Sequence, residues 1–540
     1  MPRYNPAMTD FPDTLTDLIS RSAAAGPNAI AIIDRDRTWT YVQLLETSQR
    51  LATGLAGLGI TTGDRVAFWL PNIAAYMALH LACGRLGAIT VSVNTKFRSS
   101  EVGDIVGRSG AKALILWPTF KDINFLDILA DVPANDLAAL EQFIIYDEGE
   151  GIPALPAALQ HIDQVRYADL VTAAPAEFDH AREDMGTIIF TTSGTTAAPK
   201  FVLHSQASIV RHARNVAEFF GWDDPETVLL QALPLCGTFG HVQAMATLAV
   251  GRPMISMPVF SAKAAAQIIH QHKVTNFNGS DEMFALLLQE GEGERPYPRY
   301  RFGGYAAFNP AFADIPERAD ARGMTLCGLW GMSEMQALYS LQDPAAETKT
   351  RRLAGGRTTS PQAKVRARDP ESGKILPHGE AGELEASGPS QMKEYFGDPA
   401  ATAKALTDDG YVRTGDLGYT TSDTSFVFLS RMGDVLRLGG FLVNPVEIEA
   451  HIEAHASVGE AQVVGVDTKA GTRPYAFVIP TPGNEFDRDK VMAHCLDGMA
   501  KFKVPLGISK LDAFPTTDSA NGVKIQRKKL REMAMAELGE

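Results

Sequence analysis

Hydroxyl groups are concentrated in one short stretch of this chain. Residues 191–200 have the sequence Thr-Thr-Ser-Gly-Thr-Thr-Ala-Ala-Pro-Lys and lie between two β-rich runs. Hydroxyls, free backbone N–H groups and a lysine can together bind an anion such as phosphate. The stretch is not a Walker A motif, because Gly194 lacks the Gly-Lys-Ser/Thr that should follow it. Taken alone, residues 191–200 fit an anion-binding loop and an ordinary Ser/Thr-rich surface loop equally well.

The elements that must position this loop follow an alternating pattern. Leu44, Leu51 and Leu55 recur at helical spacing over about residues 42–58, and a β-rich run follows at 66–70. Strands and helices keep alternating to about residue 330, which predicts an α/β fold of helix-covered, mostly parallel sheets. Ligands of such sheets bind at the carboxyl ends of strands. Three further loops are therefore candidates for the site, at residues 233–240, 303–308 and 330–334.

The pattern changes after about residue 355, where short strands alternate with Gly, Pro and Asp. We expect a β-rich subdomain over about 355–431, within a large N-terminal domain of residues 1–433. A small, mobile α+β C-terminal domain is expected over residues 434–540, with its hinge at Asp434.

The composition argues against several classes of protein. Lys and Arg total 50 and Asp and Glu total 64, and the net charge of −14 disfavours a nucleic-acid or anionic-membrane binder. The four cysteines form no C-x-x-C pair, which argues against a zinc site and fits a reducing compartment. The apolar stretch 76–93 contains His80 and Arg85, so it predicts a core helix and strand, not a transmembrane segment. No signal peptide is visible, and we expect a cytoplasmic protein whose oligomeric state stays open, with a homodimer as one option.

Six motifs occur in order along the chain. They are Thr192–Thr196 with Pro199-Lys200, Trp330–Glu334, Tyr411–Asp416, Arg431 with Gly433-Asp434, Gly439-Gly440 with Pro445, Glu447 and Glu449, and Asn521–Arg527. With this set the chain resembles the adenylate-forming enzymes: acyl-CoA synthetases, luciferase-type enzymes and peptide-synthetase adenylation domains. In that superfamily a carboxylate attacks the α-phosphate of ATP, giving an acyl-adenylate and pyrophosphate. A thiol, most often that of CoA, then displaces AMP.

The resemblance implies an ATP site built by both domains. Glu334 is expected to bind Mg²⁺ carried on the ATP phosphates, and Asp416 to accept both ribose hydroxyls. Lys524 is expected to neutralise charge at the α-phosphate, although Val523 separates it from Gly522 and leaves its register open. The implied catalytic residues are Thr195, Glu334 and Lys524. The implied ATP/AMP-binding residues are Thr192, Ser193, Gly194, Thr195, Thr196, Lys200, Trp330, Gly331, Met332, Ser333, Asp416 and Arg431.

The resemblance also implies a contact to adenine and a channel for CoA. Trp330 stands where Tyr is usual, and it either stacks on adenine or serves as a core aromatic. Rotation of the small domain about Asp434 would place Gly439, Gly440 and Phe441 at a channel for CoA, because glycine lets backbone approach a ligand closely.

The pocket for the acid departs most from the superfamily. Cys236 and Gly237 replace the usual aromatic-His pair, and His241 is either a substitute imidazole or part of the following helix. Asp281 and Glu282 either line the pocket or begin a helix after Ser280, and we favour the helix start. Small and aromatic residues at 303–308 favour a mostly apolar acyl or aryl acid of medium size. The predicted acyl pocket comprises Cys236, Gly237, His241, Phe277, Gly279, Gly304, Tyr305 and Ala306.

We therefore expect an AMP-forming carboxylate–CoA ligase that acts on a small-molecule carboxylic acid with ATP, Mg²⁺ and CoA. One alternative is an amino-acid adenylation enzyme that loads a carrier protein, although residues 233–240 contain no acidic side chain for an α-ammonium group. A second alternative is a luciferase-like oxygenase, which a light-emission assay would separate. An inactive nucleotide-binding scaffold is disfavoured, because Lys200, Glu334, Asp416 and Lys524 are all present.

Overall fold

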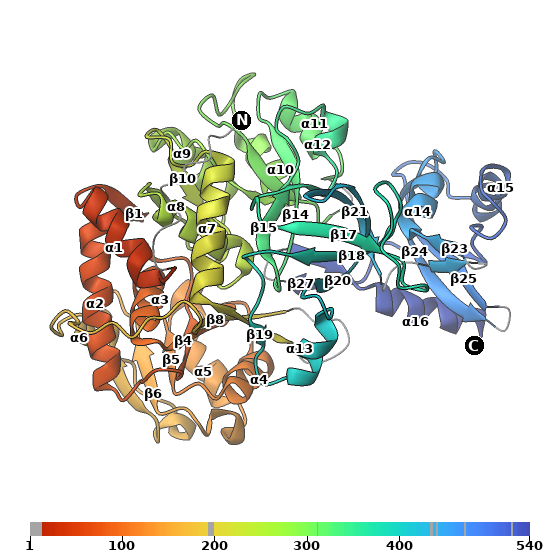
Figure 1. Ribbon diagram of the computed structural model, residues 1–540. Helices are drawn as coiled ribbons and strands as arrows, with labels where there is room; N and C mark the ends of the chain where they lie inside the picture. Colours follow the sequence, from red (N-terminus) through yellow and green to blue (C-terminus); the bar gives the residue numbers. More distant parts are fainter. Residues whose placement is uncertain are drawn as a thin grey trace.

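An eight-stranded sheet forms one half of the large N-terminal part of the chain (Figure 1). The computed structural model describes residues 13–192, 199–309, 312–432, 436–438, 441–468, 471–519 and 522–539. Ser193, Gly194, Thr195, Thr196, Asp434, Gly439 and Gly440 lie outside these described residues. In spatial order the strands are β19 (Glu394–Tyr395), β9 (Phe201–Ser205), β8 (Gly186–Thr191), β4 (Ile89–Ser92), β3 (Arg65–Trp69), β5 (Ala113–Leu116), β6 (Gln142–Ile145) and β7 (Asp163–Arg166). The pairs from β8 to β7 are parallel, while β9 and β19 extend the edge in antiparallel fashion.

Helices cover both faces of this sheet, as expected for parallel strands. Val66 and Phe68 of β3 belong to one hydrophobic cluster, and Ala67 and Trp69 belong to another. Successive side chains of a strand point to opposite faces, so the two clusters lie on the two sides of the sheet. The first cluster contains α1 (Leu15–Ala25), α2 (Tyr41–Gly57) and α3 (Ala74–Leu86), and the second contains α4 (Ser99–Ser109) and α5 (Phe125–Ala130).

The leucine spacing in the sequence correctly predicted helix α2. Thr40 caps its first turn, with Gln43 bonding back to complete a capping box. Leu44, Leu51 and Leu55 are fully buried. The stretch 76–93 forms α3 followed by β4, as predicted. None of the helices in the described part of the chain has the length and apolar character needed to cross a membrane.

A second, nine-stranded sheet joins the remaining N-terminal strands to the predicted β-rich region. In spatial order it contains β12 (Gly279–Ser280), β13 (Gly303–Ala306), β14 (Leu326–Met332), β15 (Gln336–Leu341), β16 (Gly355–Thr358), β21 (Ser425–Arg431), β20 (Val412–Ser422), β18 (Gly382–Ser387) and β17 (Lys364–Arg368). Pairing is parallel from β12 to β14 and antiparallel from there on. A change of pairing at β14 therefore coincides with the candidate loop at residues 330–334.

Helices continue to alternate with strands through this region, as the sequence pattern predicted. These helices are α7 (Gln206–Phe220), α8 (Thr238–Ala249), α9 (Ala262–Gln271), α10 (Asp281–Glu290) and α11 (Ile315–Asp320). A four-stranded sheet of β10 (Leu229–Gln231), β11 (Met254–Ser256), β1 (Ile30–Asp34) and β2 (Arg37–Thr40) lies beside them. Short helices α6 (Tyr167–Leu170), α12 (Thr348–Arg351) and α13 (Pro399–Ala405) complete this part of the chain.

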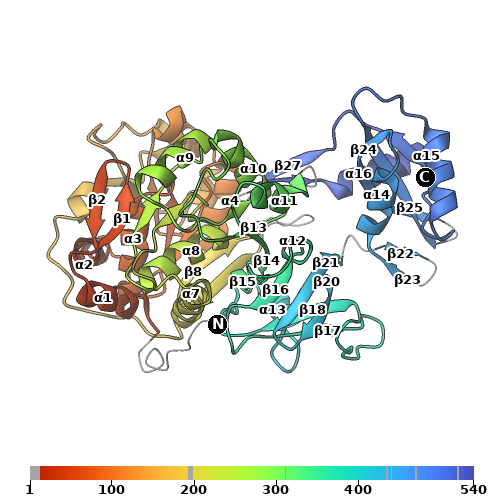
Figure 2. The same ribbon diagram turned by 90° about the horizontal axis from the view of Figure 1, so that it is seen from above.

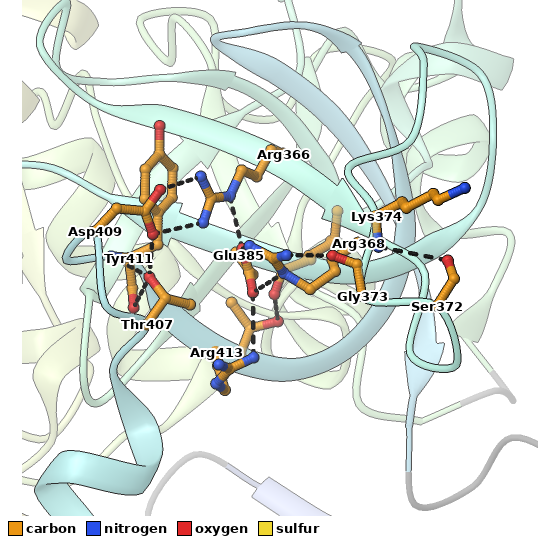
Figure 3. A network of polar contacts seen from close by, with 12 residues as sticks. Arg366, Arg368, Ser372, Gly373, Lys374, Glu385, Thr407, Asp409, Tyr411 and Arg413 are labelled. Carbon is orange, nitrogen blue, oxygen red and sulfur yellow. Dashed lines mark hydrogen bonds and ion pairs between the residues drawn. The ribbon is translucent and has the colours of Figure 1, made fainter.

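A buried carboxylate ties strands β17, β18 and β20 together (Figure 3). The Glu385 side chain on β18 has no exposed surface, and it lies 2.6 Å from Nε of Arg366 and 2.7 Å from Nε of Arg368, both on β17. Arg413 on β20 approaches the same carboxylate at 3.4 Å. Because β20 also carries Asp416, this network holds the strand of the predicted ribose acceptor.

A smaller α+β unit follows and lies to one side of the large part (Figures 1 and 2). Its elements are β22 (Leu436–Leu438), β23 (Phe441–Val443), α14 (Pro445–Glu453), β24 (Val458–Thr468), β25 (Gly471–Pro480), α15 (Arg488–Gly498), β26 (Ile508–Lys510), β27 (Thr516–Ser519), β28 (Gly522–Ile525) and α16 (Arg527–Leu538). The hairpin β27–β28 extends from this unit toward the large part (Figure 2).

Candidate active site

The two ends of the Ser/Thr-rich loop are joined by antiparallel pairing. Thr191 of β8 pairs with Phe201 of β9. Beyond them, the Thr192 N–H donates to the Lys200 carbonyl at 3.0 Å, and the Lys200 N–H donates to the Thr192 hydroxyl at 3.1 Å. Thr192 and Lys200 are thus fixed at the base of the loop, which carries the other predicted phosphate-binding residues.

Lys200 and Glu334 are brought together by a residue that the sequence did not single out. The Tyr395 hydroxyl donates to Oε1 of Glu334 at 2.6 Å, and the Lys200 Nζ lies 4.3 Å from the centre of the Tyr395 ring. Met392 adds a backbone N–H bond of 2.7 Å to the Glu334 carbonyl. Glu334 and Tyr395 are both buried, so the predicted metal ligand is held in one place.

The carboxylate of Asp416 is buried and contacts one indole N–H and one guanidinium group. Its side chain accepts a 2.8 Å hydrogen bond from the Trp330 indole N–H and pairs with Arg431 at 2.9 Å. Burial raises the pKa of Asp416 to about 6, while Arg431 and the Trp330 N–H act in the opposite direction. The charge of Glu334 also raises the pKa of Asp416, so the carboxylates predicted to bind Mg²⁺ and ribose are close enough to repel each other.

Trp330 lies inside a small hydrophobic cluster. Its ring meets those of Tyr339 and Phe426 edge to face, with centroids 5.5 and 5.4 Å away, and it is only 6% exposed. The structure therefore shows Trp330 as the partner of Asp416, and its stacking on adenine stays a prediction. Gly331 beside it admits no side chain, because a Cβ there would lie 2.6 Å from the Ala337 Cα. Met332 ends β14, and Ser333 leads directly to Glu334.

The loop before α8 carries the predicted acyl-pocket residues Cys236 and Gly237. Gly237 occupies the N-cap position of α8 and contributes no capping side chain. Gly240 must be glycine, because a Cβ there would lie 2.3 Å from the Pro234 carbonyl oxygen. The first turn of α8 therefore packs directly on the backbone of its own entry loop at Leu233 and Pro234.

His241 is part of the helix, the second of the two predicted alternatives. It is fully buried in the first turn of α8, and its Nε2 lies 3.1 Å from Nε2 of His80. Its ring also meets Phe190, one residue before Thr191. Burial and the neighbouring His80 lower the pKa of His241 well below its usual value. A neutral imidazole at this depth can accept or donate one hydrogen bond but carries no charge.

The other predicted pocket residues lie on two adjacent parallel strands. Gly279 of β12 pairs with Tyr305 of β13, and Gly304 and Ala306 flank Tyr305. The Tyr305 hydroxyl donates to the Arg352 carbonyl at 3.0 Å. Phe277 is fully buried, so its ring belongs to the core behind these strands.

The helix-start interpretation of Asp281 is confirmed, with an addition. Ser280 caps α10, and Glu282 is exposed. The Asp281 carboxylate, however, is buried and accepts backbone N–H bonds of 2.7 Å from both Phe308 and Asn309. Asp281 thereby fastens the end of the 303–308 loop to the start of α10.

The small unit contributes strands that carry two predicted residues. Lys524 pairs with Thr517 in the hairpin β27–β28, and Phe441 pairs with Leu438 between β23 and β22. The hairpin that carries Lys524 is the part of the small unit that extends toward the large part (Figure 2).

Two domain models match the chain. An AMP-binding enzyme model matches residues 19–396, and the C-terminal domain of AMP-binding enzymes matches residues 447–521. Together with the site described above, these domains define an adenylate-forming enzyme. The chain belongs to the AMP-binding enzyme family, and within it to the AMP-forming acid–CoA ligases. The predicted superfamily, enzyme class and α/β fold are confirmed.

Proteins of similar length resemble the chain from end to end. A putative acyl-CoA synthetase, YngI, from Bacillus subtilis is 29% identical over 541 residues, covering 96% of each chain. A feruloyl-CoA synthase from an Amycolatopsis species is 29% identical over 517 residues, covering 93% of this chain and 96% of the relative. The crystal structure of ATP-bound MatB from Rhodopseudomonas palustris shares the fold with a TM-score of 0.81 at 24% identity, covering 97% of this chain and all of that one.

Proposed function

We propose that this enzyme converts a medium-sized, mostly apolar acyl or aryl acid into its CoA thioester through an acyl-adenylate, using ATP, Mg²⁺ and CoA. One observation carries the proposal: Tyr395 lies between Lys200 and Glu334, and Trp330, four positions before Glu334, donates to Asp416, so residues from three distant segments are linked. The apolar and small residues on β12 and β13 support an apolar acid. A relative named feruloyl-CoA synthase supports an aryl acid in particular.

In the first half-reaction, a carboxylate oxygen of the acid bonds to the α-phosphorus of ATP, and the bond to pyrophosphate breaks. Lys200 and the Thr192 hydroxyl, both fixed at the loop base, would bind the leaving pyrophosphate. The same role is proposed for the hydroxyls of Ser193, Thr195 and Thr196, which lie outside the described residues. Asp416 orients the ribose through its ionised oxygens. Lys524, on the projecting hairpin, would add positive charge where the α-phosphate becomes more negative.

Glu334 fits a ligand for Mg²⁺. Oε1 accepts the Tyr395 hydroxyl, and across the described ranges no protein group is paired with Oε2. Within the same ranges no cluster of three or more His, Cys, Asp or Glu could hold a metal. A single carboxylate suits Mg²⁺, which binds through one or two carboxylates and substrate phosphates. When bound, Mg²⁺ neutralises phosphate charge and favours the departure of pyrophosphate.

In the second half-reaction, the CoA thiolate sulfur bonds to the acyl carbon and AMP leaves. The proposed rotation about Asp434 would bring Gly439, Gly440 and Phe441 to the thiol channel. Met432 supports a hinge just beyond it, because its N–H donates to the Gly415 carbonyl at 2.8 Å and ties it to β20.

ATP–pyrophosphate exchange over fatty, aryl, alicyclic and dicarboxylic acids tests the substrate class, and repetition with CoA or pantetheine tests the acceptor. Lys524→Ala is expected to lower adenylate formation by at least roughly 10²–10³-fold, while CoA attack on preformed adenylate stays nearly intact. Lys528→Ala is a matched control, because Lys528 is exposed on α16 in the same basic run. Equal loss of both half-reactions in Lys524→Ala would contradict the assigned role.

A further inference from the structure

The turn that carries Glu334, at residues 333–335, leads directly into unfavourable backbone conformations at the start of β15. Gln336 and Leu338 have φ angles of 60° and 58°, in the left-handed region that non-glycine residues seldom adopt. Leu338 is also fully buried, so it does not relax toward solvent. Contacts from outside residues 333–338 must therefore hold this segment in its shape.

Three residues spaced four apart supply contacts to residues 333–337, in addition to the bonds that Ser390 accepts from Gln336 and that Thr359 donates to Leu338. Nε2 of His204 lies 2.8 Å from the Ser333 carbonyl oxygen, and Nε2 of His212 lies 2.7 Å from the Ala337 carbonyl oxygen. Between them, the Ser208 carbonyl accepts a 3.0 Å bond from the Gln336 side-chain amide. Ser208 and His212 are four apart on α7 and share one face of it, and His204 lies just before the helix at the end of β9. Together they present a row of partners to residues 333–337.

Both imidazoles must act as donors, because a carbonyl oxygen only accepts. His204 and His212 are buried, and burial lowers the pKa of each to about 4. Each is therefore neutral at physiological pH and carries its proton on Nε2. A leucine of similar size would fill the same space but donate nothing.

We propose that His204 and His212 are positioning residues for Glu334, and that they act by donating Nε2–H bonds to the Ser333 and Ala337 carbonyls. β9 begins at Phe201, directly after Lys200, and α7 begins at Gln206. The segment that carries the phosphate-binding lysine therefore also sets the position of the metal-binding carboxylate. The metal-binding role of Glu334 rests on the proposed function.

The test compares His204→Leu with His204→Gln, because glutamine keeps a donor that can reach the carbonyl. Calorimetry gives the affinity of each variant for Mg-ATP and for metal-free AMP. His204→Leu is expected to weaken Mg-ATP binding about 5–10-fold, as for one lost hydrogen bond, and to leave AMP binding within about 2-fold. The ribose contact that AMP shares with ATP depends on Asp416 and its partners Trp330 and Arg431, to which the row has no printed contact in the described part of the chain. The row does contact Ser333, another predicted AMP-binding residue, but only through its backbone carbonyl, so the Ser333 hydroxyl stays in place in His204→Leu. His204→Gln is expected to restore most of the Mg-ATP affinity.

His80→Leu is a matched control, because His80 is also a fully buried imidazole but is bonded to Thr90 and His241. It should lower thermal stability without changing the ratio of the Mg-ATP affinity to the AMP affinity.

His212→Leu and His212→Gln test the other end of the row, and they decide the question if His204→Leu yields no folded protein. Equal behaviour of the Leu and Gln variants, or a parallel loss of Mg-ATP and AMP binding, overturns the proposal. The binding of Mg-ATP and AMP can be measured without any acid. If the enzyme activated none of the acids offered, the proposed function would be contradicted, but the binding experiment would still test the role of His204 and His212.

Discussion

Replacement of Trp330 by Phe separates its two conceivable contributions to nucleotide binding. The indole N–H donates to Asp416 at 2.8 Å and lowers the pKa of that carboxyl, which burial has raised to about 6. A hydrogen bond to a charged group contributes about 1.5–3 kcal/mol. At 1.36 kcal/mol for a tenfold change, its loss moves the pKa of Asp416 up by about one to two, to roughly 7–8.

This shift gives the variant a pH signature. Ribose hydroxyls need the ionised carboxylate as acceptor, and at pH 7 the ionised fraction of Asp416 falls from about nine-tenths to about one quarter if the pKa moves to roughly 7.5. Binding of adenosine should therefore weaken about fourfold at pH 7 and recover at about pH 9. Adenosine is the suitable probe, because it has the ribose hydroxyls but no phosphate that titrates in this range. Loss of adenine stacking would instead weaken binding equally at every pH.

Trp222→Phe supplies the matched control. Trp222 is fully buried, and in the described part of the chain its indole nitrogen has no hydrogen-bond partner. The same truncation there removes packing but no bond to a carboxylate. The affinity for adenosine, measured from about pH 5 to 9, should fall at the same pH on the acid side for Trp222→Phe and the natural enzyme. If the affinity of Trp330→Phe also fell at that pH, the claim that the indole N–H keeps Asp416 ionised would be refuted.

Two further substitutions test the buried carboxylates. The pKa of Asp416 is about 6 in the folded chain against 3.8 ordinarily, so the folded state loses stability as the pH rises from about 4 to 6. Denaturant unfolding of Asp416→Asn at pH 8 should therefore show a free energy of unfolding that is higher by up to about 3 kcal/mol. The same variant should show no gain at pH 4. A gain that is independent of pH would contradict this sign. Glu385→Gln should destabilise the fold by about 3 kcal/mol, because it leaves Arg366 and Arg368 without their buried partner. Glu383→Gln on the same strand should not destabilise the fold, because burial raises the pKa of that carboxyl and its ionised form is unfavourable in the folded state. Similar losses of stability in both variants would count against the Glu385 network.

The regular elements were predictable because their patterns are local. The leucines of α2 recur at helical spacing, and the apolar stretch 76–93 divides into α3 and β4 where the spacing changes. The start of α10 was likewise marked by Ser280 and the acidic residues after it.

The supports of the site were not predictable, because their partners are remote. Tyr395 and Glu334 are 61 positions apart, and His204 and Ser333 are 129 apart. A histidine in an apolar strand and a tyrosine in a two-residue strand have no spacing that indicates such contacts. Asp281 shows the same limit, since its position at a helix start was evident but its bonds to Phe308 and Asn309 were not.

The bonds around Asp416, the proposed ribose acceptor, support a hinge at the predicted position. Arg431 pairs with Asp416 through side chains, and the two residues also face each other across β20 and β21. Met432 is bound to Gly415 through its backbone, so the chain stays attached to β20 up to that residue. A rotation that began before Arg431 would remove the cation from Asp416, and the pKa of Asp416 would rise while AMP is still needed in the site. A rotation at Asp434 would leave this pair intact, so the nucleotide would remain bound during the proposed exchange of Lys524 for the thiol channel.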